Sequence, residues 1–264
     1  MNFLEPITLA AVAQIVWPLC RISAFLATMM VISGNSFPMM TRALLSLAVT
    51  VCFLPSIPNL PESAAPFSAP GILTTIKEVL IGLSMGLATL LISQAFIVAG
   101  QTIAMQTGLG FASLIDPVSG TNTAVVGQFF TVLCTLVFFC INGHLIFFRL
   151  LLLSFEVLPI GSFLPAQGLN EFIFFFGSMF TAGLAMALTA VCTMLVVNFT
   201  LGVMTKAAPQ LNVFSLGFAI SMVVGMFVLI FSLNAFMSNF TNNFNDVFNA
   251  TCTLIGTSCD GVLR

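Results

Sequence analysis

The residues that could carry out acid–base or metal chemistry are few in this sequence. One histidine, His144, is present among 264 residues, with eight acidic and six basic side chains and seven cysteines. A single histidine without a neighbouring acid cannot build a zinc site, and we expect it to pack beside a helix break at Gly143. The P-loop pattern G-x-x-x-x-G-K-[ST] and the zincin pattern H-E-x-x-H do not occur. We therefore expect no enzyme, no catalytic residue, no metal and no cofactor.

The composition excludes most classes of soluble protein. The chain is 59% hydrophobic and 5% charged, whereas soluble domains carry about 25% charged residues. Such a chain cannot cover itself with polar surface, so it is expected to be an integral membrane protein or a subunit buried in a membrane complex. It has no basic patch, and nucleic-acid binding is therefore excluded.

Apolar stretches predict an all-α membrane protein with about six helical segments, some of them broken or kinked. The stretches cover roughly 7–32, 43–58, 72–103, 129–153, 172–204 and 213–237, and all but the second reach the ~20 residues needed to cross a bilayer. A polar tail follows the last stretch. Several glycines offer places for helices to pack closely, namely Gly82, Gly86, Gly177, Gly183 and Gly202.

The distribution of charges predicts an orientation. Counting six spans places Arg42 and Lys206 on one side and nearly all acids on the other, so the positive-inside rule puts both termini in the periplasm. In an oxidising compartment Cys252 and Cys259 of the tail could form a disulfide, and buried free thiols are the alternative.

Charges inside apolar runs need compensation, because a charge near mid-span costs several kcal/mol unless it meets water or a partner. Lys77 and Glu78 are interpreted as an interfacial pair at a helix start. Too few acids remain for Arg21 and Arg149, and partner subunits or a hydrated cavity are expected to satisfy them. Two functions stay open on these grounds, a small-solute secondary transporter and a conduit or assembly subunit. The lack of an internal repeat and of buried coupling acids favours the second.

Three stretches in order resemble the FliR family, components of the flagellar type III export gate. They are "MQTGLGFASLIDP" at 105–117, "NGHLIFFRLLLLSFEVLPIG" at 142–161 and "APQLNVFSLGF" at 208–218. Ala219 departs from the proline that is common in the family, which puts the kink expected there in doubt. The virulence-secretion counterpart is the close alternative.

The resemblance implies an export gate in the bacterial inner membrane, at the flagellar basal body. Its partners would be FliP and FliQ, with FlhB and FlhA, and unfolded flagellar proteins and membrane lipid would contact it. Residues 1–171 would resemble FliP and residues 172–264 would resemble FliQ, with a hairpin at 172–237. The expected subunit-interface residues are Lys206, Pro209, Gln210, Arg21 and Arg149.

The resemblance also implies that the glycine-rich segment 106–122 is a loop that plugs the pore. Glycines lower the cost of unusual backbone angles, and the apolar side chains could lodge reversibly in a passage. The alternative is an ordinary connection between helices. The predicted plug residues are Gly108, Gly110, Phe111, Leu114, Ile115, Asp116 and Pro117.

Overall fold

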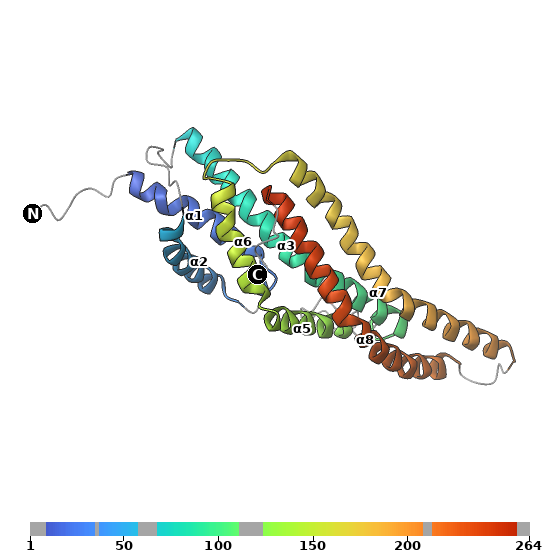
Figure 1. Cartoon of the computed structure of the whole chain (residues 1–264). Helices are drawn as coiled ribbons and strands as arrows, with labels where there is room; N and C mark the ends of the chain where they lie inside the picture. Colours follow the sequence, from blue (N-terminus) through green and yellow to red (C-terminus); the bar gives the residue numbers. More distant parts are fainter. Residues whose placement is uncertain (1–8, 35–36, 58–67, 111–123, 208–212, 258–264) are drawn as a thin grey trace, which may run out of the picture. The chain divides into compact units, whose positions relative to one another are not determined.

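The computed structural model describes residues 9–34, 37–57, 68–110, 124–207 and 213–257, and within these ranges the chain is almost entirely helical (Figure 1). The all-α prediction is therefore confirmed. The elements in chain order are α1 (Leu9–Thr28), α2 (Met39–Phe53), the 3-10 turn η1 (Leu54–Ser56), α3 (Ala69–Thr107), α5 (Val125–Cys140), α6 (Gly143–Val157), α7 (Ala166–Ala207) and α8 (Val213–Ile255).

Among the residues that the structure describes, four helices are long and apolar enough to cross a membrane. They are α2 extended to Ser56, α3, α7 and the Gly217–Ile255 portion of α8, and a fifth span is possible if α5 and α6 count together. The second stretch, predicted to fall short of about 20 residues, belongs to a candidate span of 18 residues that begins earlier than predicted, at Met39. α1 is not among these helices, so the six-span count that placed both termini on one side is not supported.

The fourth apolar stretch is a broken helix. α5 and α6 meet at 67°, because Asn142 takes a left-handed backbone conformation with φ 55°. His144 follows this break, and its ring lies 5.2 Å from that of Phe139. The position predicted for His144 is confirmed.

The last two helices are much longer than a bilayer requires. α7 has 42 residues and α8 has 43, so each is roughly 60 Å long, twice a ~30 Å hydrocarbon core. The sequence predicts that the hairpin ends at residue 237 and that a polar tail follows. This is wrong for residues 238–255, because α8 continues to Ile255. Phe236, Phe240, Phe244 and Phe248 bury one face of this portion of the helix.

The described chain packs as two units. Unit 1 consists of 1–91, 138–175 and 246–264, and unit 2 consists of 92–137 and 176–245. α3, α7 and α8 each contribute to both units. This division differs from the linear one at 171/172, which rests on likeness to two partner proteins and stays a prediction.

Close helix packing at glycine is confirmed at three of the five predicted positions. A Cβ at Gly82 or Gly86 of α3 would collide with backbone oxygens of α1, those of Arg21 and Phe25. One at Gly183 of α7 would lie 2.7 Å from the carbonyl oxygen of Ala95. Nothing in the described part of the chain lies within 4 Å of Gly177 or Gly202, so close packing at these two positions stays a prediction.

Candidate functional site

The predicted plug begins later than its sequence pattern indicated. α3 continues to Thr107, and it ends where Gly108 adopts φ 81°, a conformation that side chains rarely allow. The N–H of Gly110 then donates to the carbonyl oxygen of Ala104 at 2.9 Å and so satisfies one of the open carbonyls of the helix end.

The other predicted plug residues lie outside the described residues. They are Phe111, Leu114, Ile115, Asp116 and Pro117. A Cβ at Gly108 would lie 3.0 Å from the ring of Phe218 on α8. The start of the segment is therefore seated against α8 within unit 2.

The predicted interface residues are placed differently from one another. Lys206 occupies the last turn of α7 and is exposed, while Pro209 and Gln210 lie outside the described residues. Arg149 is exposed on α6. These assignments to a subunit interface stay predictions.

The prediction that Arg21 lies at a subunit interface is wrong. Its side chain has 0% exposure, and Glu78 supplies its counter-ion at 2.7 Å from within the same chain. It therefore needs no partner subunit and does not reach one. The interpretation of Lys77 and Glu78 as an interfacial pair was likewise wrong for Glu78, which lies in the interior of α3 and is fully buried.

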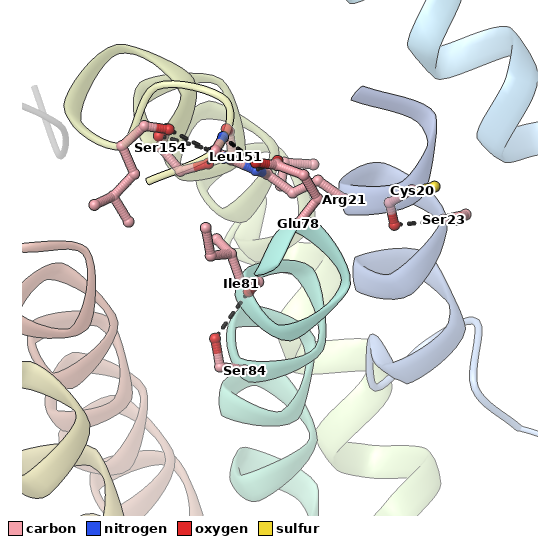
Figure 2. A network of polar contacts seen from close by, with 10 residues as sticks. Cys20, Arg21, Ser23, Glu78, Ile81, Ser84, Leu151 and Ser154 are labelled. Atoms are coloured by element: carbon pink, nitrogen blue, oxygen red, sulfur yellow. Dashed lines mark hydrogen bonds and ion pairs between the residues drawn. The ribbon is translucent and has the colours of Figure 1, made fainter. Parts of the chain in front are cut away.

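The buried cluster around Arg21 joins three helices of unit 1. Figure 2 shows Arg21 of α1 and Glu78 of α3 pointing toward each other beside Ser154 of α6. Arg21 Nε donates to Glu78 Oε2, and Nη1 donates to the carbonyl oxygen of Ser154 at 2.9 Å. Nη2 donates to the carbonyl oxygen of Leu158 at 3.0 Å. The guanidinium also stacks 4.2 Å above the ring of Phe155.

These contacts give hydrogen-bond donors to the backbone carbonyl groups at the C-terminal end of α6. The last carbonyls of a helix have no partner within the helix and carry partial negative charge, and Arg21 caps those of Ser154 and Leu158. The acceptors lie in the stretch "SFEVLPIG" that carries the family resemblance. Residues 154–158 of that stretch thus have a structural role in holding the guanidinium.

The two neighbouring charges of α3 hold the turn after α6. Glu78 Oε1 accepts from the N–H of Gly161 at 3.0 Å, and Lys77 Nζ donates to the carbonyl oxygen of Gly161 at 2.8 Å. Side chains of α3 therefore bind both the backbone N–H and the carbonyl oxygen of Gly161. Trp17 Nε1 adds a contact from α1 to Thr75 Oγ1 at 3.3 Å.

The cluster is suited to holding helices together and not to catalysis. Its charged atoms are buried, and the guanidinium of Arg21 makes its polar contacts to groups of the protein itself. The adjacent sequence Gly82-Leu-Ser84-Met-Gly86 matches the G-x-S-x-G pattern of hydrolases, a match that sequence reasoning missed. In those enzymes the serine stands on a strand-to-helix turn, whereas Ser84 is buried within α3 and donates to the carbonyl oxygen of Ile81 at 2.8 Å (Figure 2).

Unit 2 is built around phenylalanine rings. The rings of Phe96 and Phe236 are 4.7 Å apart, and those of Phe130 and Phe236 are stacked at 5.8 Å. Phe240 continues the row along α8 at 6.3 Å from Phe236. Such pairs contribute about 0.5–1.5 kcal/mol each beyond the area they bury. Asn243 Nδ2 adds a buried polar contact by donating to the carbonyl oxygen of Ile92 at 3.3 Å.

The cysteines offer no metal site among the residues that the structure describes, where no three His, Cys, Asp or Glu side chains gather. Five cysteines of the apolar runs are free thiols. Cys252, near the end of α8, is disulfide-bonded. Cys259, its expected partner, lies outside the described residues.

Comparison with known proteins gives consistent matches. The family described as "Bacterial export proteins, family 1" matches residues 12–247. The flagellar biosynthetic protein FliR of Pectobacterium carotovorum subsp. carotovorum is 35% identical over 219 residues, 80% of each chain. FliR of Escherichia coli (strain K12) is 33% identical over 211 residues, 78% of each chain. The surface presentation of antigens protein SpaR of Shigella flexneri is 26% identical over 144 residues, 54% of this chain and 56% of its own.

Proposed function

This chain belongs to the family of bacterial export proteins, family 1, and it is similar to FliR proteins over most of its length. We propose that it is a component of the flagellar type III protein export gate in the inner membrane. Unfolded flagellar proteins would pass through the channel to which it contributes. The match to a virulence-related relative is weaker in identity and covers less of the chain, so the flagellar role is favoured over a virulence-secretion role.

One observation carries the proposal of a plug. α3 stops abruptly at Thr107 with the left-handed Gly108, and α5 starts at Val125. The glycine-rich segment thus leaves from a fixed point seated against Phe218. A glycine-rich segment that starts from a held point fits a closure that clears with local backbone changes.

The size of the plug residues suits a reversible closure. If Phe111, Leu114 and Ile115 together bury about 100–200 Å² of apolar surface in the pore, the closed state gains roughly 3–5 kcal/mol. That is enough to keep nearly all gates shut, and small enough for an arriving polypeptide to offset.

Deleting the segment tests this proposal. Replacing 108–121 by a short Gly-Ser link should leave assembly intact and make cells leak small ions or dyes, and Phe111→Ala should leak less. The control is an equal shortening of the proline-rich 58–67, which should cause no leak. Loss of assembly without leakage from the remaining complex would identify the segment as a structural connector and end the plug proposal.

Partners are proposed from the family resemblance. The gate would contain FliP and FliQ, with FlhB and FlhA nearby, and the exposed Arg149 and Lys206 would contact them. Co-purification from a mild detergent, followed by mass measurement of the complex, tests this. A solitary monomer that transports a small solute would favour the transporter alternative instead.

The orientation is proposed from charge and from the disulfide. Disulfides persist in oxidising compartments, so the bonded Cys252 supports a periplasmic end of α8. Lys206 at the other end of the hairpin would then lie in the cytoplasm, and a periplasmic N-terminus follows if α1 also crosses. Reporter fusions that work only outside the cytoplasm should be active at Arg264 and inactive at Arg42, and activity at Arg42 would invert the topology.

A further inference from the structure

The C-terminal end of α8 packs as part of the core of unit 1. Thr251 and Leu254 have 0% exposure, and Cys252 has 3%. The start of α7 lies against this end, because a Cβ at Gly168 would collide with the carbonyl oxygen of Thr253. Both segments belong to unit 1, so the last turns of α8 are held by close contact with another helix of the same unit.

The chain reverses direction immediately after this end. Gly256 takes φ 80°, a left-handed conformation that ends the helix. Its N–H donates to the carbonyl oxygen of Thr253 at 3.1 Å, and the N–H of Thr257 donates to that of Cys252 at 3.0 Å. These two bonds form a Schellman turn, which brings the backbone after α8 back beside Cys252.

Cys252 is disulfide-bonded, and the turn indicates its partner. The other five cysteines that the structure describes are free thiols, which leaves Cys259. Cys259 comes two residues after Thr257, and two residues span about 7 Å at most. Because Thr257 is bonded to the backbone of Cys252, a bridge from Cys259 to Cys252 is within reach.

The burial of Cys252 sets the order of events. Thiol–disulfide exchange requires that a thiolate reach the disulfide it attacks. A sulfur on a residue with 3% exposure is closed to an oxidant of the size of a protein. The bond must therefore form before the end of α8 packs against α7, and the packing then protects the bond from reductants.

We propose that Cys252 and Cys259 are a modification site, which a thiol oxidase of the periplasm closes during assembly so that the end of α8 is fixed on the start of α7. The proposal rests on the proposed periplasmic orientation of this end. The two thiols together lose two protons and two electrons as the S–S bond forms, and the reactive disulfide of the oxidase is reduced to two thiols. The exchange passes through a mixed disulfide between the two proteins.

Thiol mapping of the full chain, purified with its membrane partners, tests the modification. The complex is denatured without reductant in the presence of a maleimide, and its peptides are identified by mass spectrometry. From cells with an active periplasmic thiol oxidase, Cys252 and Cys259 should be recovered joined and unlabelled. Cys192, an exposed free thiol, should be labelled and serves as the internal control. Cells that lack the oxidase should lose the joined form.

A variant tests what the bond does for the fold. Cys259→Ser removes the bond and leaves the buried Cys252 in place, so the packing of α8 keeps its side chains. Loss of a disulfide that closes a short loop should lower the unfolding temperature of the chain by about 5–10 °C. Hydrogen exchange should accelerate in 246–257 and not in 217–237. Cys192→Ser on α7 is the matched control and should change neither measurement.

Three outcomes overturn the proposal. Free thiols at Cys252 and Cys259, in cells where the reporter fusion at Arg264 is active, would mean that the site is not oxidised although the orientation is correct. Unchanged hydrogen exchange of 246–257 in Cys259→Ser would mean that the bond does not fix the end of α8. An inactive reporter at Arg264 would refute the orientation itself, and the modification with it.

Discussion

Unit 1 contains almost all of the charge of the chain, whereas unit 2 contains almost none. Of the fourteen Asp, Glu, Lys and Arg residues, only Asp116 and Lys206 fall within the ranges of unit 2. Unit 1 places an Arg–Glu pair at 0% exposure between three helices. Unit 2 packs phenylalanine rings against one another instead.

The two kinds of packing have different consequences. Hydrogen-bonded charges fit one geometry, because a displaced buried charge loses its partner at a cost of several kcal/mol. Ring contacts are individually weak and fall off gradually, so helices can shift by small amounts at little cost. Unit 1 is therefore expected to be the more rigid of the two, and Gly108, where the proposed plug starts, falls within the range of unit 2.

The largest effect is expected from removing the acid of the buried pair. Glu78→Ala leaves the Arg21 guanidinium buried without its counter-ion, and the loss of stability should be about 3–5 kcal/mol. Recovery of the complex and its thermal unfolding in mild detergent measure this loss. Glu156→Ala is the control, because Glu156 is exposed on α6.

A double variant separates charge from packing at this cluster. Arg21→Met combined with Glu78→Met removes both charges and keeps apolar volume, so it should recover much of the stability lost in Glu78→Ala. If Glu78→Ala unfolds at the same temperature as the unmodified chain, the pair does not fix unit 1, and the contrast with unit 2 fails.

A smaller effect is expected from overpacking a helix contact in unit 2. Gly183→Val places a side chain against the backbone of α3 and should cost about 1–3 kcal/mol. Gly177→Val is a matched control on the same helix, because nothing lies within 4 Å of that position. Thermal unfolding of the two variants gives the comparison, and equal effects would show that the α3–α7 contact does not hold unit 2.

A still smaller effect is expected from trimming one ring. Phe240 has 0% exposure and pairs with Phe96 at 5.8 Å, so Phe240→Leu should cost about 1 kcal/mol. Phe199→Leu removes a ring that is 73% exposed on α7, and it should not change the unfolding temperature. A loss from Phe240→Leu as large as that from Glu78→Ala would remove the proposed difference between the units.

Sequence reasoning succeeded where a local pattern decides the structure. Hydropathy predicted the helices, and the helix break at Gly143 was foreseen beside His144. The close packing of Gly82 and Gly86 follows from their four-residue spacing, which puts both on one face of α3. The sequence signal for each of these features lies within a few residues, although the two glycines pack against the distant α1.

It failed where the structure depends on distant partners. Arg21 and Glu78 are 57 residues apart, so nothing in the order of residues pairs them, and the adjacent Lys77 offered a nearer explanation. The sequence predicts a polar tail after residue 237 because the apolar run ends there. Phenylalanine at every fourth residue from 236 to 248 was the signal of a buried helical face that could have corrected this.

The last prediction concerns the use of charge outside the chain. Unit 1 pairs a charge internally, whereas Lys206 of unit 2 stands exposed in the last turn of α7, where it also complements the helix dipole. Loss of that interaction costs the isolated chain well under about 1 kcal/mol at an exposed position. If a partner subunit buries Lys206 against a carboxylate, reversing the charge breaks a desolvated pair in the complex. Lys206→Glu should therefore leave the unfolding temperature of the chain nearly unchanged while it reduces co-purification with the partner membrane proteins and motility.

Lys206→Arg keeps the charge and should retain both. Normal assembly of Lys206→Glu would mean that this charge faces lipid headgroups or water, and that unit 2 meets its partners through apolar contacts alone.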